Sequence, residues 1–181
     1  MRQGGAVGGG LSTVLTRFGR DEHEVLAPAA PWRSAVALVL SVFGLGVSIY
    51  LTVAHFVGTQ ALVCSDSGVI NCAKVTTSAQ SHFLGIPVAV LGLAYYLVMC
   101  AVNLPAAWRS DDWRVHGLRL ALAVVGIAFA LYLVAAELLI IGSICIWCTT
   151  VHVITFLLFV LVLATVPAML GWGGRAGDEA Y

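Results

Sequence analysis

The chain has 181 residues, of which 60% are hydrophobic and only 10% charged, and its formal net charge is zero. Soluble domains carry about 25% charged residues, so this composition excludes an ordinary soluble protein and indicates an integral membrane protein. The length leaves room for one membrane domain without a second soluble domain, and we expect no nucleic-acid partner.

Four apolar runs are long enough to cross about 30 Å of hydrocarbon as helices, which takes roughly 20 residues each. They cover residues 35–57, 83–104, 118–141 and 146–171. Because backbone groups in lipid must be hydrogen-bonded internally, we predict an all-α bundle of four transmembrane helices spanning residues 32–172. Segment 1–31 is predicted to be a disordered cytoplasmic tail, and 173–181 a cytoplasmic C-terminal tail.

The basic residues predict the orientation, because Lys and Arg favour the cytoplasmic side of short loops. The two tails and the loop between the second and third runs hold Arg2, Arg17, Arg20, Arg33, Arg109, Arg114, Arg119 and Arg175. The opposite set of loops holds only Lys74. We therefore predict that both termini are cytoplasmic and that the loops at 58–82 and 142–145 face the outside of the plasma membrane.

Four of the five cysteines lie in these outer loops or at their edge, where disulfides persist. They form the patterns Cys64-x7-Cys72 and Cys145-x2-Cys148, whereas Cys100 alone is interpreted as a small buried apolar residue. Cys148 is predicted to open the fourth helix, whose N-terminus favours a reactive thiolate. A Cys-x-x-Cys disulfide closes a very small ring, so exchange is a better use for it than stabilisation.

Turn-forming residues 65–68 allow the first loop to reverse and bring Cys64 near Cys72, and residues 73–81 are predicted to form a short helix at the membrane surface. Two alternatives use the same sulfur atoms. Both pairs can be structural disulfides that brace a non-enzymatic bundle. Four thiolates can also bind zinc in a metal-binding membrane protein, although the x7 spacing is unusual for such a site.

The pattern of these motifs resembles the vitamin K epoxide reductase family, particularly its bacterial quinone-linked members. The resemblance rests on "CSDSGVINC", Ser78 six residues later, "GIPVAVLGLAYY" and "CIWC", and it covers about residues 32–170. It implies a helix bundle around a quinone pocket near the outer membrane face. The electron acceptor would be menaquinone or ubiquinone, and no metal is implied.

The resemblance also implies a role for each cysteine. Cys145 and Cys148 match the active-site disulfide, with Cys148 meeting the quinone, while Cys64 and Cys72 match a loop pair that takes electrons from an external thiol protein. Cys72 would attack Cys145. Some bacterial relatives carry a fused thioredoxin-like domain, for which 181 residues are too few, so we expect the partner to be a separate extracytoplasmic thioredoxin-like protein.

Four further residues are candidates for the quinone site. Ser78 matches a family Ser or Thr near the quinone, while Ser81 and His152 stand where animal members have Asn and Tyr, which favours plain quinone reduction over epoxide reduction. An intramembrane carboxylate is costly, so Glu137 is a candidate proton donor, or else a protonated side chain bonded to another helix or reaching the interface. His152, one turn after Cys148, is a candidate hydrogen-bond donor or a core histidine.

These observations predict a membrane thiol:quinone oxidoreductase. It would reoxidise an extracytoplasmic disulfide-forming protein and pass two electrons to membrane quinone. Lipid-soluble quinone arrives from the bilayer and protein thiols arrive from water, and a Cys-x-x-Cys at the boundary is accessible to both.

Overall fold

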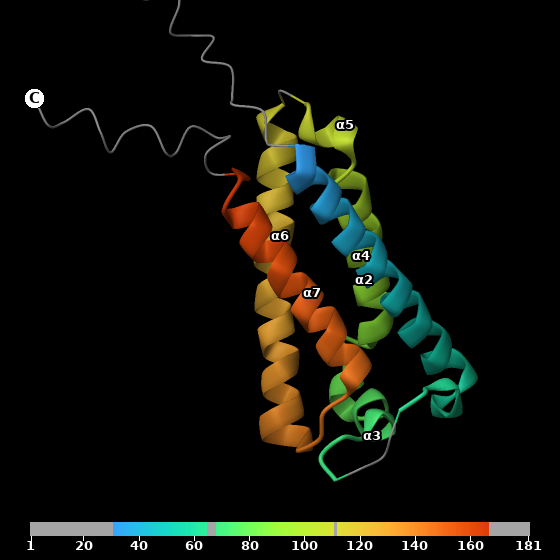
Figure 1. Cartoon of the computed structure of the whole chain (residues 1–181). Coiled ribbons are helices and arrows are strands. Elements are labelled where there is room, and N and C mark those ends of the chain that lie inside the picture. The colour runs from blue at the N-terminus through green and yellow to red at the C-terminus, as the bar shows by residue number, and fades with distance from the viewer. Residues whose placement is uncertain (1–30, 65–67, 111, 167–181) are drawn as a thin grey trace, which may run out of the picture.

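The structure is a computed structural model that describes residues 31–64, 68–110 and 112–166. It is an antiparallel bundle of four main helices, α2 (Pro31–Val57), α4 (Val88–Val102), α6 (Trp113–Ala135) and α7 (Ile146–Leu163) (Figure 1). The predicted tails lie outside the described residues, apart from Pro31, which begins α2 four residues before the start of the first predicted run.

Short elements connect the helices at the two ends of the bundle. The first loop contains the 3-10 turn η2 (Thr59–Ala61), α3 (Cys72–Thr76) and the 3-10 turn η3 (Ala79–Ser81), and α5 (Pro105–Trp108) lies at the opposite end (Figure 1). The short helix predicted over 73–81 is therefore split in two. Asn71 caps the first piece, because its side chain accepts a hydrogen bond from the Lys74 amide at 2.8 Å.

Three of the described helices are long and apolar enough to cross a membrane: Pro31–Val57, Trp113–Ile141 and Ile146–Leu163. Lipid solvates apolar side chains, so the large hydrophobic residues exposed along these helices are consistent with a membrane protein. The four-span prediction is not confirmed by length alone, because α4 has only 15 residues and extends roughly 22 Å.

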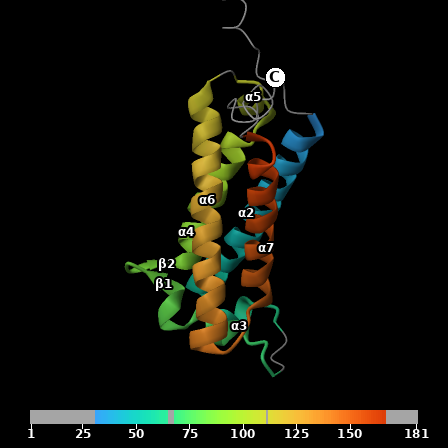
Figure 2. The ribbon, with the colours of Figure 1, turned by 90° about the vertical axis from the view of Figure 1, so that its left-hand side faces the viewer.

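The second predicted run begins with a hairpin rather than a helix. Strands β1 (His82–Phe83) and β2 (Ile86–Pro87) pair antiparallel, and Figure 2 shows them projecting from the side of the bundle. Proline has no amide hydrogen and restricts the residue before it to extended conformations, so the helix begins only after Pro87. The prediction of a helix from residue 83 was therefore wrong by five residues.

The third and fourth runs differ from their predicted bounds at one end each. α6 begins at Trp113, five residues before the predicted start, because the Asp112 side chain caps it by accepting from the Arg114 amide at 2.9 Å. It continues into a π-helical turn, η4 (Ala136–Ile141), which ends where predicted. α7 begins at Ile146 as predicted but ends at Leu163, eight residues before the predicted end at 171.

The main cluster of buried hydrophobic residues lies toward the end of the bundle that carries α5. The core there contains Tyr96, Met99, Trp108 and Leu158, all at most 4% exposed. A Cβ atom at Gly44 of α2 would lie 2.1 Å from the Tyr96 ring of α4, so only glycine allows this close packing. At the other end, the helices diverge around a cavity and a smaller core made of the cysteines.

Candidate active site

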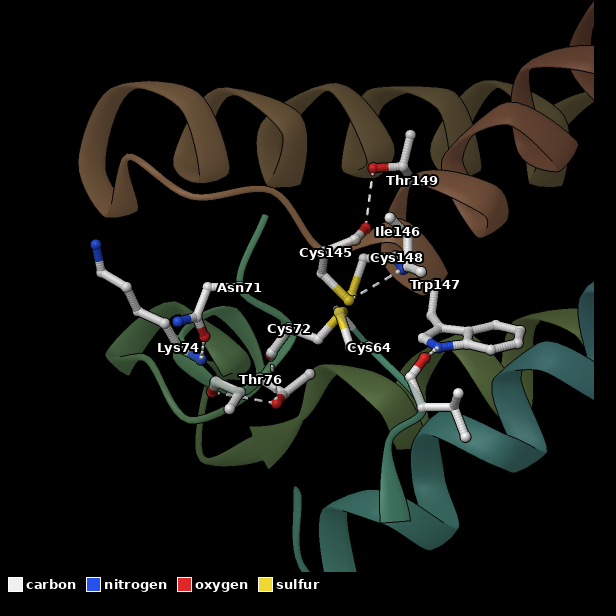
Figure 3. Close-up of a disulfide and its surroundings, with 12 residues drawn as sticks. Cys64, Asn71, Cys72, Lys74, Thr76, Cys145, Ile146, Trp147, Cys148 and Thr149 are labelled. Atoms are coloured by element: carbon white, nitrogen blue, oxygen red, sulfur yellow. Dashed lines mark hydrogen bonds between the residues drawn. A yellow bond between two sulfur atoms is a disulfide. The ribbon is translucent and has the colours of Figure 1, made fainter. Parts of the chain in front are cut away.

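The four cysteines of the predicted pairs meet at the end of the bundle that carries α3. Buried Cys72 and Cys145, both 0% exposed, form one apolar cluster with Val75, and half-buried Cys64 and Cys148 pack against it. Cys64 and Cys72 form a disulfide, whereas Cys145 and Cys148 are free thiols. Figure 3 shows these side chains gathered between the first loop and the start of α7.

Backbone hydrogen bonds place the disulfide beside the Cys-x-x-Cys motif. The residues before Cys72 form a parallel β-bridge with the residues before Cys145, centred on Ile70 and Ile144. The Ile144 amide donates to the Val69 carbonyl at 2.9 Å, and the Asn71 amide donates to the Ile144 carbonyl at 3.1 Å. This bridge brings together two segments that are more than 70 residues apart in the sequence.

The turn into the Cys-x-x-Cys motif depends on Gly142. This residue has φ +62° and ψ 30°, a left-handed conformation that glycine adopts at little cost and that commonly ends a helix. The Ser143 amide donates back to the Glu137 carbonyl at 3.2 Å, which closes the π-helical turn. The chain then needs only two residues to reach Cys145 at the start of α7.

Cys145, not Cys148, has the sulfur that caps α7. It is the residue before the first helical position, and its sulfur accepts a hydrogen bond from the Cys148 amide at 3.4 Å. The sequence had assigned the helix-terminal thiolate to Cys148, and the structure corrects this. The Cys148 thiol and the amides of Cys148 and Trp147 donate to Cys145 and lower the pKa of its thiol, while burial acts in the opposite direction.

This arrangement predicts how Cys145 titrates. In a Cys100→Ala background with the Cys64–Cys72 disulfide intact, Cys148→Ala removes the largest cause of the lowered pKa. The thiolate of Cys145 should then form only at higher pH, as measured by ultraviolet thiolate absorbance. Cys148→Ser keeps a hydroxyl donor and should retain part of the effect. Identical titrations in the two variants would contradict the role of the Cys148 side chain.

A cavity of about 450 Å³ adjoins the thiols and extends into the bundle. This volume is within the range of small-molecule sites, and the cavity wall is mostly apolar with a few polar groups, as such sites usually are. Its lining includes Cys148 and all four residues predicted for the quinone site: Ser78, Ser81, Glu137 and His152. The other three cysteines of the two pairs do not line it.

The four candidate residues reach the cavity from three parts of the fold. Ser78 and Ser81 come from the loop after α3, where the Ser81 hydroxyl donates to the Ser78 carbonyl at 2.7 Å. Glu137, 5% exposed, comes from the π-helical turn, and His152, 9% exposed, comes from α7. The His152 Nδ1 atom is buried and has no hydrogen-bond partner among the described residues.

Two tyrosines of α4, Tyr95 and Tyr96, also line the cavity; the sequence left open whether they line a pocket or pack between helices. Tyr96 is satisfied, because its hydroxyl donates to the Val151 carbonyl at 3.0 Å and lies 2.9 Å from the Thr155 hydroxyl. The Tyr95 hydroxyl is buried without a partner in the described part of the chain. The motif "GLAYY" contained the signal, but periodicity cannot distinguish a cavity wall from a packed helix face.

The disulfide argues against the zinc interpretation, because it removes two of the four thiolates that such a site needs. Within the described ranges, no group of three or more His, Cys, Asp or Glu side chains is placed to hold a metal ion.

A disulfide next to a free dithiol, in an apolar helix bundle and beside an apolar cavity, defines the site of a membrane thiol–disulfide oxidoreductase. The family model of the vitamin K epoxide reductase family matches residues 35–163, which is more than half of the chain. The chain therefore belongs to the vitamin K epoxide reductase family, whose members are oxidoreductases that work with quinones and thioredoxin-like partners. A search of curated proteins found no match.

Proposed function

We propose that the protein oxidises an extracytoplasmic thioredoxin-like dithiol protein and passes the two electrons to membrane quinone. The observation that carries this proposal is the order of burial along the cysteines. Cys64 is half-buried, Cys72 and Cys145 are fully buried, and Cys148 lines the cavity. This order forms a route from the aqueous surface to an apolar pocket that lipid-soluble molecules can enter.

The first half of the reaction is thiol–disulfide exchange at the loop pair. A partner thiolate attacks the accessible sulfur of Cys64, and Cys72 leaves as a thiolate; the second partner thiol then displaces Cys64 and becomes oxidised. Cys72 attacks Cys145 of an oxidised Cys145–Cys148 pair, and Cys148 leaves as a thiolate. Cys64 then attacks Cys72 and releases Cys145, which leaves the loop pair oxidised and the Cys-x-x-Cys pair reduced.

The structure has this oxidation state, with a Cys64–Cys72 disulfide and free thiols at Cys145 and Cys148. The second half of the reaction closes the Cys145–Cys148 disulfide. Two electrons and two protons leave the thiols and convert a quinone in the cavity to hydroquinone. The lowered pKa of Cys145 favours its thiolate, which suits attack on the Cys148 sulfur as that sulfur passes its electron pair to the quinone.

The residues around the cavity fit a quinone. The wall is mainly apolar, and the unpartnered His152 nitrogen marks a place where a polar group of a ligand can be bound. We propose that His152 orients a quinone oxygen and that Glu137 accepts or supplies protons. Ser78 and Ser81 would form the outer edge of the site. Because Asn and Tyr are replaced by Ser81 and His152, we propose a quinone rather than an epoxide as substrate.

We propose the orientation predicted from the basic residues, with four spans. α4 runs from the cysteine end to the α5 end beside the longer helix α2, so it would complete the fourth crossing with the residues that flank it (Figure 1). Both termini would be cytoplasmic in the plasma membrane. The cysteine end, with Lys74, would face outward, where an oxidised relay persists.

The test of the proposed function is quinone reduction by the purified protein in lipid nanodiscs. With a dithiol donor, the protein should convert short-chain menaquinone and ubiquinone analogues to hydroquinones, with one equivalent of disulfide formed per quinone. A bundle braced by inert disulfides has no route for electrons, so it would show only the uncatalysed rate. A comparison of the two analogues identifies the preferred quinone.

His152 gives a further prediction. Replacement of His152 by Gln or Ala should lower turnover by roughly ten-fold or more, because a hydrogen bond to the oxygen that gains negative charge is lost or weakened in a water-poor site. His152→Tyr should retain more activity than His152→Ala, because a phenol still donates. Unchanged rates with lowered melting temperatures would instead identify His152 as a core residue.

A further inference from the structure

Trp147 and Tyr50 hold the Cys64 side of the loop pair against the Cys-x-x-Cys motif. The Trp147 indole nitrogen donates to the Val63 carbonyl at 3.0 Å, and the Val63 amide donates to the Tyr50 hydroxyl at 2.8 Å. The same hydroxyl donates to the Ala61 carbonyl at 2.8 Å. Both backbone polar groups of Val63, the residue before Cys64, are thus bound by these two side chains.

The two aromatic rings also contact each other, with centroids 4.7 Å apart. Tyr50 belongs to α2 and Trp147 to the first turn of α7, between Cys145 and Cys148, so the segment before Cys64 is fixed to two helices. Figure 3 shows the Trp147 side chain lying beside this segment. We call Tyr50, Trp147 and their hydrogen bonds to the 61–63 backbone the aromatic clamp.

The aromatic clamp complements the β-bridge on the other side of the disulfide. The bridge fixes the Cys72 side through backbone atoms of Ile144, whereas the clamp fixes the Cys64 side through side chains. Both sides of the Cys64–Cys72 disulfide are therefore attached to the segment that carries Cys145 and Cys148. Of the two attachments, only the clamp can be removed by changing a side chain.

The exchange between the two cysteine pairs requires different positions for the Cys72 and Cys64 sulfur atoms. Cys72 bonds to Cys145 in the intermediate, so it must stay beside Cys145. Cys64 must remain close to Cys72 as a free thiolate, because its attack on Cys72 releases Cys145 and ends the exchange. Well-oriented intramolecular reactions have effective molarities many orders above solution concentrations, and small misplacements lose much of this advantage.

We propose that Trp147 and Tyr50 are positioning residues for this exchange. They hold Cys64 where it can displace Cys145 from Cys72, and so favour the Cys64–Cys72 disulfide over the Cys72–Cys145 mixed disulfide. This inference rests on the proposed function for its biological meaning, but the equilibrium between the two disulfides is a property of the chain alone. No electrons enter or leave, because one disulfide and one thiol are exchanged for another disulfide and thiol.

The experiment uses the full chain with Cys148→Ala and Cys100→Ala, which leaves three cysteines and one disulfide. The protein is equilibrated in nanodiscs at a pH that allows exchange, quenched in acid, alkylated and digested without reduction. Mass spectrometry then gives the ratio of Cys72–Cys145 to Cys64–Cys72. Trp147→Phe keeps an aromatic ring but removes the indole donor, and Tyr50→Phe keeps its ring but removes the hydroxyl.

Both substitutions should raise the ratio by roughly five-fold or more, because Trp147→Phe loses one hydrogen bond to the 61–63 backbone and Tyr50→Phe loses two. The matched control is Trp113→Phe, because Trp113 is 67% exposed and begins α6 at the opposite end of the bundle. It should leave the ratio unchanged. If one clamp variant fails to fold, as judged by its melting temperature, the other supplies the result.

The proposal would be overturned if neither clamp substitution raises the ratio of Cys72–Cys145 to Cys64–Cys72 above that of the control. Absence of the mixed disulfide from every variant would overturn it in the same way. A rise of equal size with Trp113→Phe would also overturn it, because the effect would then be a general loss of stability. The result is independent of the proposed function. Quinone reduction can fail while the ratio responds to the clamp, and the ratio can stay constant in a protein that reduces quinone.

Discussion

Replacement of Cys148 or Cys145 by alanine is expected to reduce quinone reduction to the uncatalysed rate with every donor. Cys148 is the only cysteine of the two pairs that lines the cavity, so we propose it as the thiol that meets the quinone. Cys145 is its proposed disulfide partner, and without it the two-electron oxidation would have no bond to close. The measurement is steady-state formation of hydroquinone by each variant in nanodiscs, with dithiothreitol and with reduced thioredoxin as donors.

The matched control is Cys100→Ala, which removes the remaining free thiol from α4. Cys100 does not line the cavity and is not part of the cysteine cluster, so its variant should keep wild-type turnover. Wild-type turnover in Cys145→Ala or Cys148→Ala would show that electrons reach quinone by another route. Loss of turnover in all three variants would point to instability instead of chemistry.

The sequence predicted a helical membrane protein and two cysteine pairs, but not the contacts that bring the pairs together. Hydropathy and the one-sided distribution of arginine predicted a membrane bundle with an outer face, and the cysteine spacing divided the sulfur atoms into pairs. These features follow from short-range patterns or from composition, which can be read without tertiary contacts. The pairing of Cys64 with Cys72 in the structure agrees with that division.

Two differences at helix starts had signals in the sequence that hydropathy alone did not use. Pro87 marks the end of the hairpin and the start of α4, and Asp112 is a typical N-cap residue that places the start of α6 at Trp113. Hydropathy measures the cost of burial in lipid. It does not register where backbone hydrogen bonding begins or ends, so the boundaries it gives are shifted by several residues.

Other features had no local signal. The β-bridge between Ile70 and Ile144 and the hydrogen bond from Trp147 to Val63 join segments that are distant in sequence. The assignment of the helix-capping sulfur to Cys145 depends on where α7 begins, and a shift of a few residues changes which thiol accepts the helix amides. These contacts and the identity of the capping sulfur depend on the tertiary fold.

The loop pair should behave differently from the Cys-x-x-Cys pair because it is proposed to be a relay. In Cys64→Ala or Cys72→Ala, quinone reduction driven by reduced thioredoxin is expected to fall by roughly 100-fold or more, since the pathway that depends on aligned intramolecular exchange is lost. A folded protein donor cannot reach Cys145, which is fully buried beneath the loop.

A small dithiol can reach the Cys-x-x-Cys pair more easily than a folded protein can. Cys148 is half-buried and lines an apolar cavity, so dithiothreitol that enters the site can reduce the Cys145–Cys148 disulfide without the relay. The same variants should therefore keep measurable turnover with dithiothreitol. The ratio of the thioredoxin-driven rate to the dithiothreitol-driven rate should fall in these variants and stay unchanged in the Cys100→Ala control. The measurement compares both donors at matched concentrations of thiol and quinone.

The donor ratio separates three roles for the loop pair. A structural disulfide would lower both rates together with the melting temperature, because its loss weakens the fold without selecting a donor. A relay lowers the thioredoxin-driven rate selectively. If both alanine variants oxidise thioredoxin as fast as the wild type does, protein thiols reach the Cys-x-x-Cys pair directly. The half-buried sulfur of Cys64 would then lie outside the electron path, and the order of burial from Cys64 to Cys148 would need another explanation.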